Sequence, residues 1–129
     1  MIAVVATVAG SFAVDLDEDE LEPWVGDLSA AAPLALNLPR LVAAAAAGST
    51  VVAVVDTKPP LVVSHDAGAT WRESGRGLPA GRAVAVFEDD PDIVVYATRN
   101  RLYVSRDGGT FWSSLAVELP EIEAVEIRS

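Results

Sequence analysis

The chain has 129 residues, of which 51% are hydrophobic, so it is long and apolar enough for one domain with a sizeable core and is not a disordered segment. It has no cysteine and one histidine, which excludes disulfide frameworks, thiolate chemistry and multi-histidine metal sites within one chain. The formal net charge of −10 disfavours nucleic acid as a partner.

The elements begin at the N-terminus with an apolar stretch, residues 1–13. It lacks a basic start and is interrupted by Thr7, Gly10 and Ser11, so strands are expected there rather than a signal peptide. No stretch is long enough to span a membrane, and a cytoplasmic location is the simplest expectation. The eight arginines to one lysine, with abundant alanine and valine, indicate a prokaryotic source.

An acidic run, 15–20, follows these strands. Its alternating aspartates resemble the start of a calcium-binding loop, but the expected glycine is missing and Gly26 stands where the bidentate glutamate would be. A solvated loop is therefore expected.

Further strands are predicted by short apolar and β-branched runs that are separated by turn residues. The alanines at 43–47 favour a helix by propensity, yet their place in the repeat described below favours a strand. The expected strands are 2–7, 12–14, 41–47, 51–55, 61–63, 70–71, 82–87, 93–98, 102–104, 110–112 and 122–127.

Two eight-residue segments are near copies of each other and lie 41 residues apart. Both read Ser-x-Asp-x-Gly-x-x-Trp, the first from Ser64 to Trp71 and the second from Ser105 to Trp112. Leu-Pro pairs at 38–39, 78–79 and 119–120 recur with nearly the same period. A degenerate third copy is expected upstream, with Asp17 in the place of Asp66 and Asp107. A period near 40 residues is typical of repeat architectures with one four-stranded unit per repeat.

The repeated segment resembles the Asp-box (BNR repeat) of sialidase-like β-propellers, including the photosystem-assembly-factor type. The resemblance implies an all-β propeller of four-stranded antiparallel blades, with three blades in this single domain of residues 1–129. Blade 1 is expected to comprise 1–30 plus 121–129, blade 2 to comprise 38–73, and blade 3 to comprise 78–115.

Three blades do not close a ring, because propellers have four to eight. Two chains supply six blades, so a homodimer is expected. In this arrangement the C-terminal strand of each chain completes the first blade of the partner by a Velcro-type strand exchange.

The box residues are expected to be structural rather than catalytic. The carboxylate accepts backbone N–H groups, the glycine supplies a positive φ, and the tryptophan is buried between sheets. The residues are Ser64, Asp66, Gly68, Trp71, Ser105, Asp107, Gly109 and Trp112. His65 is expected to be a solvated turn residue, and Tyr96 and Tyr103 to be packing residues.

No sialidase-type catalytic set can be matched residue by residue, so the chain is not expected to be an enzyme. No catalytic residue, cofactor or metal site is predicted. A glycoside hydrolase remains an alternative, because carboxylates are plentiful.

The blade register assigns the whole net charge to the face that carries the boxes, and two thirds of the cations to the opposite face. A candidate site for an anionic group or acidic ligand on that opposite face comprises Arg40, Arg82, Arg99 and Arg101. The leading hypothesis is a non-enzymatic binding or assembly scaffold for a protein or polymer. The alternative is an oligomeric, lectin-like carbohydrate-binding propeller; neither nucleic acid nor membrane is expected as a partner.

Overall fold

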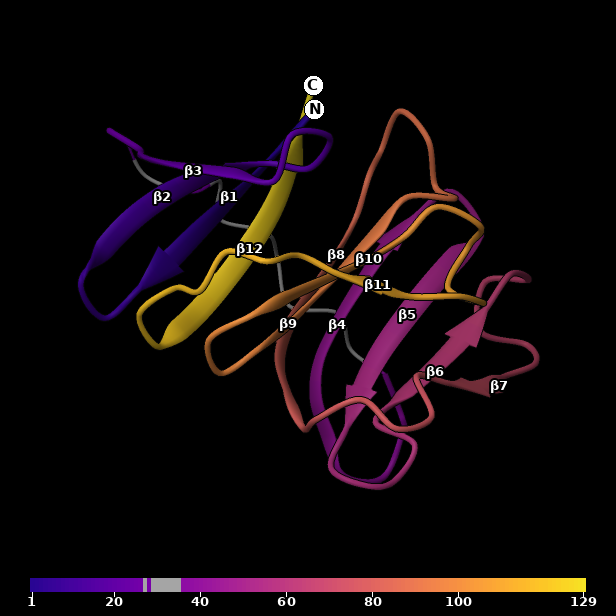
Figure 1. Ribbon diagram of the computed structural model, residues 1–129. Coiled ribbons are helices and arrows are strands. Elements are labelled where there is room, and N and C mark those ends of the chain that lie inside the picture. Colours follow the sequence, from indigo (N-terminus) through magenta and orange to yellow (C-terminus); the bar gives the residue numbers. More distant parts are fainter. Residues whose placement is uncertain (27, 29–35) are drawn as a thin grey trace.

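The fold was obtained as a computed structural model that describes residues 1–26, 28 and 36–129. Every element within this part of the chain is a β-strand (Figure 1). The strands are β1 (Ile2–Thr7), β2 (Gly10–Asp15), β3 (Glu20–Pro23), β4 (Leu41–Ala47), β5 (Thr50–Val55), β6 (Leu61–Ser64), β7 (Arg72–Ser74), β8 (Gly81–Val86), β9 (Val94–Thr98), β10 (Leu102–Ser105), β11 (Ser113–Ser114) and β12 (Ile122–Arg128).

These strands form three four-stranded antiparallel sheets. The first sheet has the order β12-β1-β2-β3, the second β4-β5-β6-β7 and the third β8-β9-β10-β11. The all-β fold expected from the sequence, with three such sheets, is confirmed. The alanine-rich strand is confirmed as well, because β4 runs from Leu41 to Ala47 and pairs with β5 along its length.

One irregularity recurs at the same place in all three sheets. The inner strands β4, β8 and β12 each skip a residue against the next strand, between Leu41 and Ala43, between Gly81 and Ala83, and between Ile122 and Ala124. A bulge at the same register position in each sheet shows that the three sheets are copies of one structural unit. It also aligns their residues with one another, independently of any sequence motif.

The first sheet is completed within one chain. β12 pairs with β1 from Ile2↔Arg128 to Thr7↔Ile122, so the two ends of the chain lie together (Figure 1). The expected exchange of this strand between two chains is therefore wrong for this structure. The hydrogen bonds and apolar side chains that β1 needs at its edge are already supplied by the C-terminus of its own chain.

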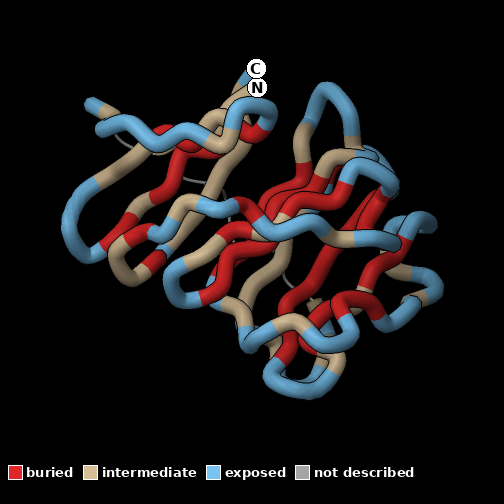
Figure 2. The backbone as a smooth tube through the Cα atoms, viewed as in Figure 1, coloured by how far each residue is buried: buried red, intermediate tan, exposed pale blue. Residues whose placement is uncertain are grey.

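The third sheet lies between the other two. One apolar cluster joins the first sheet to the third and includes Val5, Val14, Val95, Leu102 and Ile122. A second cluster joins the second sheet to the third and includes Val52, Leu61, Val84 and Tyr96. Buried backbone accordingly runs along the middle of the strands, while the turns are exposed (Figure 2). The order of sheets in space is therefore first, third, second.

The fourth strands begin later than the sequence suggested. They were expected at 70–71 and 110–112, whereas β7 starts at Arg72 and β11 at Ser113. The tryptophan of each repeated segment belongs to the turn, because the aspartate of that segment binds backbone N–H groups up to four residues further on. Strand pairing can resume only after those bonds are complete.

Candidate functional site

The first repeated turn, Ser64–Trp71, is held by a local network of hydrogen bonds. Ser64 Oγ donates to Asp66 Oδ1 (2.7 Å) and accepts from Gly68 N (2.8 Å). Asp66 Oδ1 also accepts from Thr70 N (2.8 Å), and its Oδ2 accepts from the Thr70 hydroxyl (2.5 Å). Gly68 has φ 93°, a value that side chains rarely adopt. The polar groups of the turn are thus used to bend the backbone.

The second repeated turn, Ser105–Trp112, repeats this geometry. Ser105 Oγ donates to Asp107 Oδ1 (2.7 Å) and accepts from Gly109 N (2.8 Å). Asp107 Oδ1 accepts from the backbone N–H groups of Thr110 (3.1 Å) and Phe111 (3.0 Å). Gly109 has φ 90°, close to that of Gly68. Two turns with the same sequence pattern therefore have the same hydrogen-bond network.

These networks keep both carboxylates ionised. The hydroxyl of Thr70, then its backbone N–H, then Ser64, lower the pKa of Asp66 from 3.8 to about 2. The backbone N–H of Phe111 and then the Ser105 hydroxyl lower the pKa of Asp107. A general acid that works near neutral pH needs a raised pKa, so neither carboxylate is suited to donate a proton in catalysis.

The lowered pKa of Asp66 predicts a loss of stability in acid. A depressed pKa contributes stability that is fully present above the unfolded value near 3.8 and is lost as the pH falls through about 2. Between pH 4 and pH 2, the free energy of unfolding of the wild type is expected to fall more steeply than that of Asp66→Asn. Urea denaturation across this range measures it, with Asp89→Asn, in an exposed turn, as the control. Equal slopes for wild type and Asp66→Asn would contradict the prediction.

The expected third copy of the repeated turn is not built in the same way. β2 and β3 are joined by a short hairpin in which Asp15 faces Glu20. The carboxylate that accepts the N–H groups of this turn is Asp15 and not Asp17: Asp15 Oδ1 accepts from Glu18 N (3.0 Å) and Asp17 N (2.9 Å). The N–H of Glu18 and then that of Asp17 lower the pKa of Asp15. The turn is too short for a carboxylate at position 17 to reach N–H groups four residues ahead, so the assignment of Asp17 is wrong.

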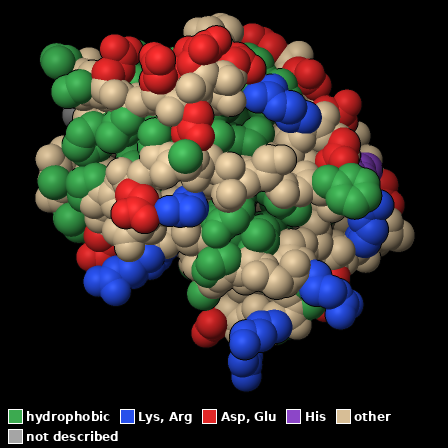
Figure 3. Space-filling view, in the orientation of Figure 1, with side chains coloured by type: hydrophobic (Ala, Val, Ile, Leu, Met, Phe, Trp, Pro, Cys, Tyr) green, Lys and Arg blue, Asp and Glu red, His purple; other side chains and the backbone are tan. Residues whose placement is uncertain are grey.

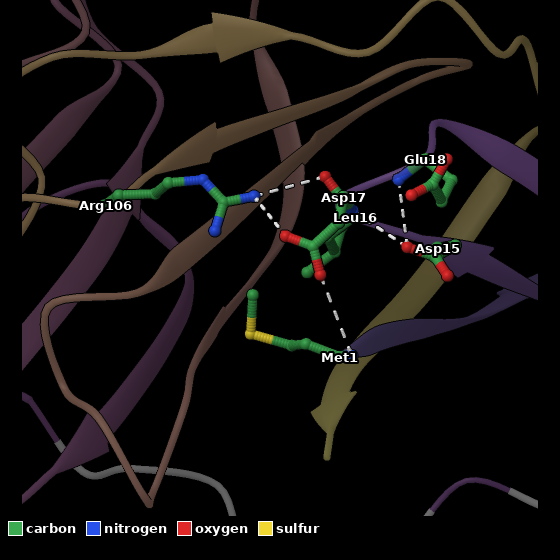
Figure 4. A network of polar contacts seen from close by, with 6 residues as sticks. All are labelled: Met1, Asp15, Leu16, Asp17, Glu18 and Arg106. Atoms are coloured by element: carbon green, nitrogen blue, oxygen red, sulfur yellow. Dashed lines mark hydrogen bonds and ion pairs between the residues drawn. The ribbon is translucent and has the colours of Figure 1, made fainter.

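Asp17 instead receives a side chain from the third sheet (Figure 4). Arg106 Nη2 lies 3.2 Å from Asp17 Oδ1 and donates to the carbonyl of Leu16 at 3.2 Å. The N-terminal amine of Met1 lies 3.9 Å from Asp17 Oδ2. Arg106 occupies the position in its turn that His65 occupies in the other, and His65 Cε1 lies 2.9 Å from where a Cβ on Gly108 would be. The residue before the aspartate of each repeated turn thus contacts the next sheet.

Two shallow cavities lie beside the two repeated turns, at positions that correspond in the repeat. The first has a volume of about 270 Å³ and is lined by Val63, His65, Asp66, Thr70, Trp71 and Arg72. The second, of about 280 Å³, is lined by Leu16, Val104, Arg106, Asp107, Phe111, Ser113 and Leu115. Each contains an aromatic side chain, and Phe111 is 77% exposed. The sequence pattern did not predict these cavities; the feature that points to the second of them is the aromatic Phe111 at a variable position of its turn.

Tyr96, Tyr103 and Trp112 form an aromatic group between the second and third sheets. The Tyr96 ring centre lies 6.1 Å from that of Tyr103 and 6.0 Å from that of Trp112. The Tyr96 hydroxyl donates to the Pro79 carbonyl (2.6 Å), and burial raises its pKa. The Trp112 indole N–H donates to Ser74 Oγ (3.0 Å). These side chains join two sheets.

The arginines of the predicted anion site are mostly paired with carboxylates. Arg82 Nη2 lies 2.9 Å and Arg99 Nε 3.7 Å from Glu121 Oε1, and Arg101 Nη2 lies 2.8 Å from Glu118 Oε1. The structure thus brings Arg82, Arg99 and Arg101 to one segment, 118–121, which the sequence did not connect with them. Arg40 precedes β4, where its carbonyl accepts from Asp56 N (2.9 Å).

Charge is unevenly spread over the surface. In Figure 3 most acidic side chains lie along the upper edge of the molecule, and most Lys and Arg side chains lie lower. Among the described residues there is no group of three or more His, Cys, Asp or Glu side chains that could hold a metal ion. The same residues include no helix that is long and apolar enough to cross a membrane.

The three repeated sheets, each with its inner strand packed against that of a neighbour, define a β-propeller-like fold. Among solved structures the chain is similar to the GH74 enzyme of Niastella koreensis, with a TM-score of 0.51 and 23% identity. The similarity covers 92% of this chain and 18% of that chain, and GH74 enzymes are β-propellers. No protein-family model and no curated protein matches the chain. At this level of identity the likeness supports the fold alone.

Proposed function

We propose that the protein is a non-enzymatic binding scaffold built from Asp-box blades. The assignment of the two repeated turns as Asp-boxes is supported by their Ser-x-Asp-x-Gly-x-x-Trp pattern and by their common hydrogen-bond network. The carboxylates of Asp66 and Asp107 accept hydrogen bonds from groups within their own turns. Two kinds of surface among the described residues are candidates for a ligand: the two cavities, and the arginine-bearing edge, which comprises Arg82, Arg99 and Arg101 with Glu118 and Glu121.

The observation that carries the proposal is the convergence of three arginines on the segment 118–121. Glu121 is shared by Arg82 and Arg99, so one carboxylate serves two guanidinium groups. Arg99 is 71% exposed at its side chain. Exposed ion pairs contribute little to stability, so a carboxylate or phosphate on a partner can replace Glu121 at small cost. The ligand is therefore proposed to be an acidic segment of a protein or polymer.

Titration with a hexaglutamate peptide at low salt tests the arginine-bearing edge. Arg99→Gln is expected to weaken binding about tenfold, as for loss of one charge-assisted contact. The matched control is Arg72→Gln, which removes an arginine beside the repeated turns. No binding by the wild type, or equal weakening by both variants, would reject the site.

A carbohydrate-binding propeller is the second candidate. It is favoured by the two cavities at corresponding repeat positions, each with an aromatic side chain on which a sugar ring could stack. A glycan array separates the two functions: a glycan hit that is lost in Phe111→Ala supports the carbohydrate-binding function. A glycoside hydrolase is disfavoured because the carboxylates that line the cavities have lowered pKa values.

A further inference from the structure

Two sheet faces of the described molecule carry no packed sheet, because the third sheet lies between the other two. The outer face of the second sheet comprises Ala44, Ala46, Val51, Ala53 and Val62. The outer face of the first sheet comprises Val4, Ala6, Ser11, Ala13, Trp24 and Ala124. Strand pairing places the strand residues on one side of each sheet, and the bond from Trp24 N to the Ser11 carbonyl adds Trp24 to the face of the first sheet. None of these residues belongs to either core cluster. Val4, Ala13, Val51 and Ala53 are buried within the chain, Ala46 is exposed, and the others are half-buried.

The recurring bulge shows what the outer face of the second sheet is built to contact. It aligns Ala44 with Val84 and Ala53 with Tyr96. Val84 and Tyr96 lie on the face of the third sheet that packs against the second sheet. The outer face of the second sheet therefore corresponds to the face of the third sheet that the second sheet covers. Here Ala46 is exposed, and Val42, at the bulge near the start of the same strand, is 47% exposed.

The two repeated turns also differ in whether a neighbouring sheet covers them. In the second turn, Ser74 of the neighbouring sheet donates from Oγ to the Gly109 carbonyl and accepts from the Trp112 indole, and Gly109 is buried. In the first turn, Gly68 is only half-buried and the preceding Ala67 is exposed. Within the described residues, no hydrogen bond joins the Trp71 indole to another sheet. The first turn lacks the neighbour that covers the second.

The first sheet carries a side chain with a hydrogen-bond donor at the position that Ser74 occupies in the second sheet. Ser74 faces Leu61 in the second sheet, and in the first sheet Trp24 stands at this position, since its backbone N donates to the Ser11 carbonyl (3.0 Å). Leu115 makes the same bond to Leu102 in the third sheet (3.0 Å). The Trp24 indole nitrogen is buried and has no acceptor in the part of the chain that is described, and the Arg128 guanidinium lies 5.3 Å above its ring.

We propose that a second copy of this chain covers both faces. The outer face of the first sheet packs on the outer face of the partner's second sheet, and the reverse contact forms across the two-fold axis. The Trp24 indole N–H then donates to the carbonyl of the partner's Gly68, as Ser74 does to Gly109 within one chain. Two chains make a ring of six sheets, within the range in which propellers close, whereas three would make nine. β12 stays on its own β1, and the interface does not depend on the ligand proposed above.

Sedimentation equilibrium of the full chain tests the assembly, with an expected mass of twice the 13.5 kDa of one chain. Ala46→Arg places a charge on the outer face of the second sheet and is expected to give a folded monomer. Ala80→Arg makes the same change in an exposed loop and is expected to remain dimeric. A wild-type monomer at 100 μM, or dimerisation of both arginine variants, overturns the proposal; circular dichroism verifies that each variant is folded.

Trp24→Phe tests the assigned hydrogen bond and keeps most of the apolar ring. The dissociation constant of the dimer is expected to rise about tenfold, in line with one buried hydrogen bond formed in each of two symmetric contacts. An unchanged dissociation constant in a dimer that Ala46→Arg disrupts would overturn the pairing of Trp24 with the partner's Gly68.

Discussion

Gly81→Ala is expected to lower the free energy of unfolding by about 3 kcal/mol, at the upper end for overpacking of a core. A Cβ on Gly81 would lie 2.1 Å from Tyr96 Cε1 and 2.5 Å from its hydroxyl oxygen. The tyrosine ring is completely buried, is held by its hydrogen bond to the Pro79 carbonyl, and is flanked by Tyr103 and Trp112. It therefore has no free space into which to move.

Urea denaturation of a double-mutant cycle isolates this clash. In the background of Tyr96→Leu, the cost of Gly81→Ala is expected to fall below about 1 kcal/mol, because leucine lacks the ring atoms and the hydroxyl that the added Cβ would meet. Gly77→Ala is the matched control, since its φ is 87° but no atom lies within 4 Å of the added Cβ. Its cost of about 1–2 kcal/mol measures backbone strain alone. Additive effects of the Gly81 and Tyr96 substitutions would contradict the clash, because they would show that the tyrosine ring moves aside without cost.

Ile122→Ala is expected to cost about 2–5 kcal/mol, the range for truncating a large buried aliphatic side chain. Ile122 is fully buried where β12 begins, in the cluster that joins the first and third sheets, and its N–H donates to the Arg99 carbonyl (2.8 Å). Truncation weakens the anchor of the strand that covers the edge of β1. Glu123→Ala, one residue later and exposed, is expected to change stability by less than about 0.5 kcal/mol.

Hydrogen exchange locates the effect of Ile122→Ala. Amides of β1 and β12 are expected to lose protection together, while β5 and β9 keep theirs, because the strand and its edge open as one unit. Uniform loss of protection would mean that the anchor holds the whole molecule rather than the first sheet.

The repeated turns were predictable because their interactions are local. Ser64, Asp66 and Gly68 make their bonds within an eight-residue segment, so the sequence pattern specifies the geometry. The strand assignment of the alanine run came from the same repeat, against the propensity of alanine for helix. The third turn was assigned wrongly because the length of the β2–β3 hairpin, set by strand pairing, decides which aspartate reaches the backbone N–H groups.

The sequence by itself determined the first three strands of each repeat, the period of the repeat and the two turns, because each depends on side chains a few residues apart; the outermost strands β3, β7 and β11 were missed or placed too early. Only the tertiary structure decided that β12 closes the first sheet of its own chain, since that pairing joins residues more than a hundred positions apart. It also decided that Arg82, Arg99 and Arg101 meet Glu118 and Glu121, and that Trp24 corresponds to Ser74. Such contacts depend on the order and register of the sheets in space, which no local pattern encodes.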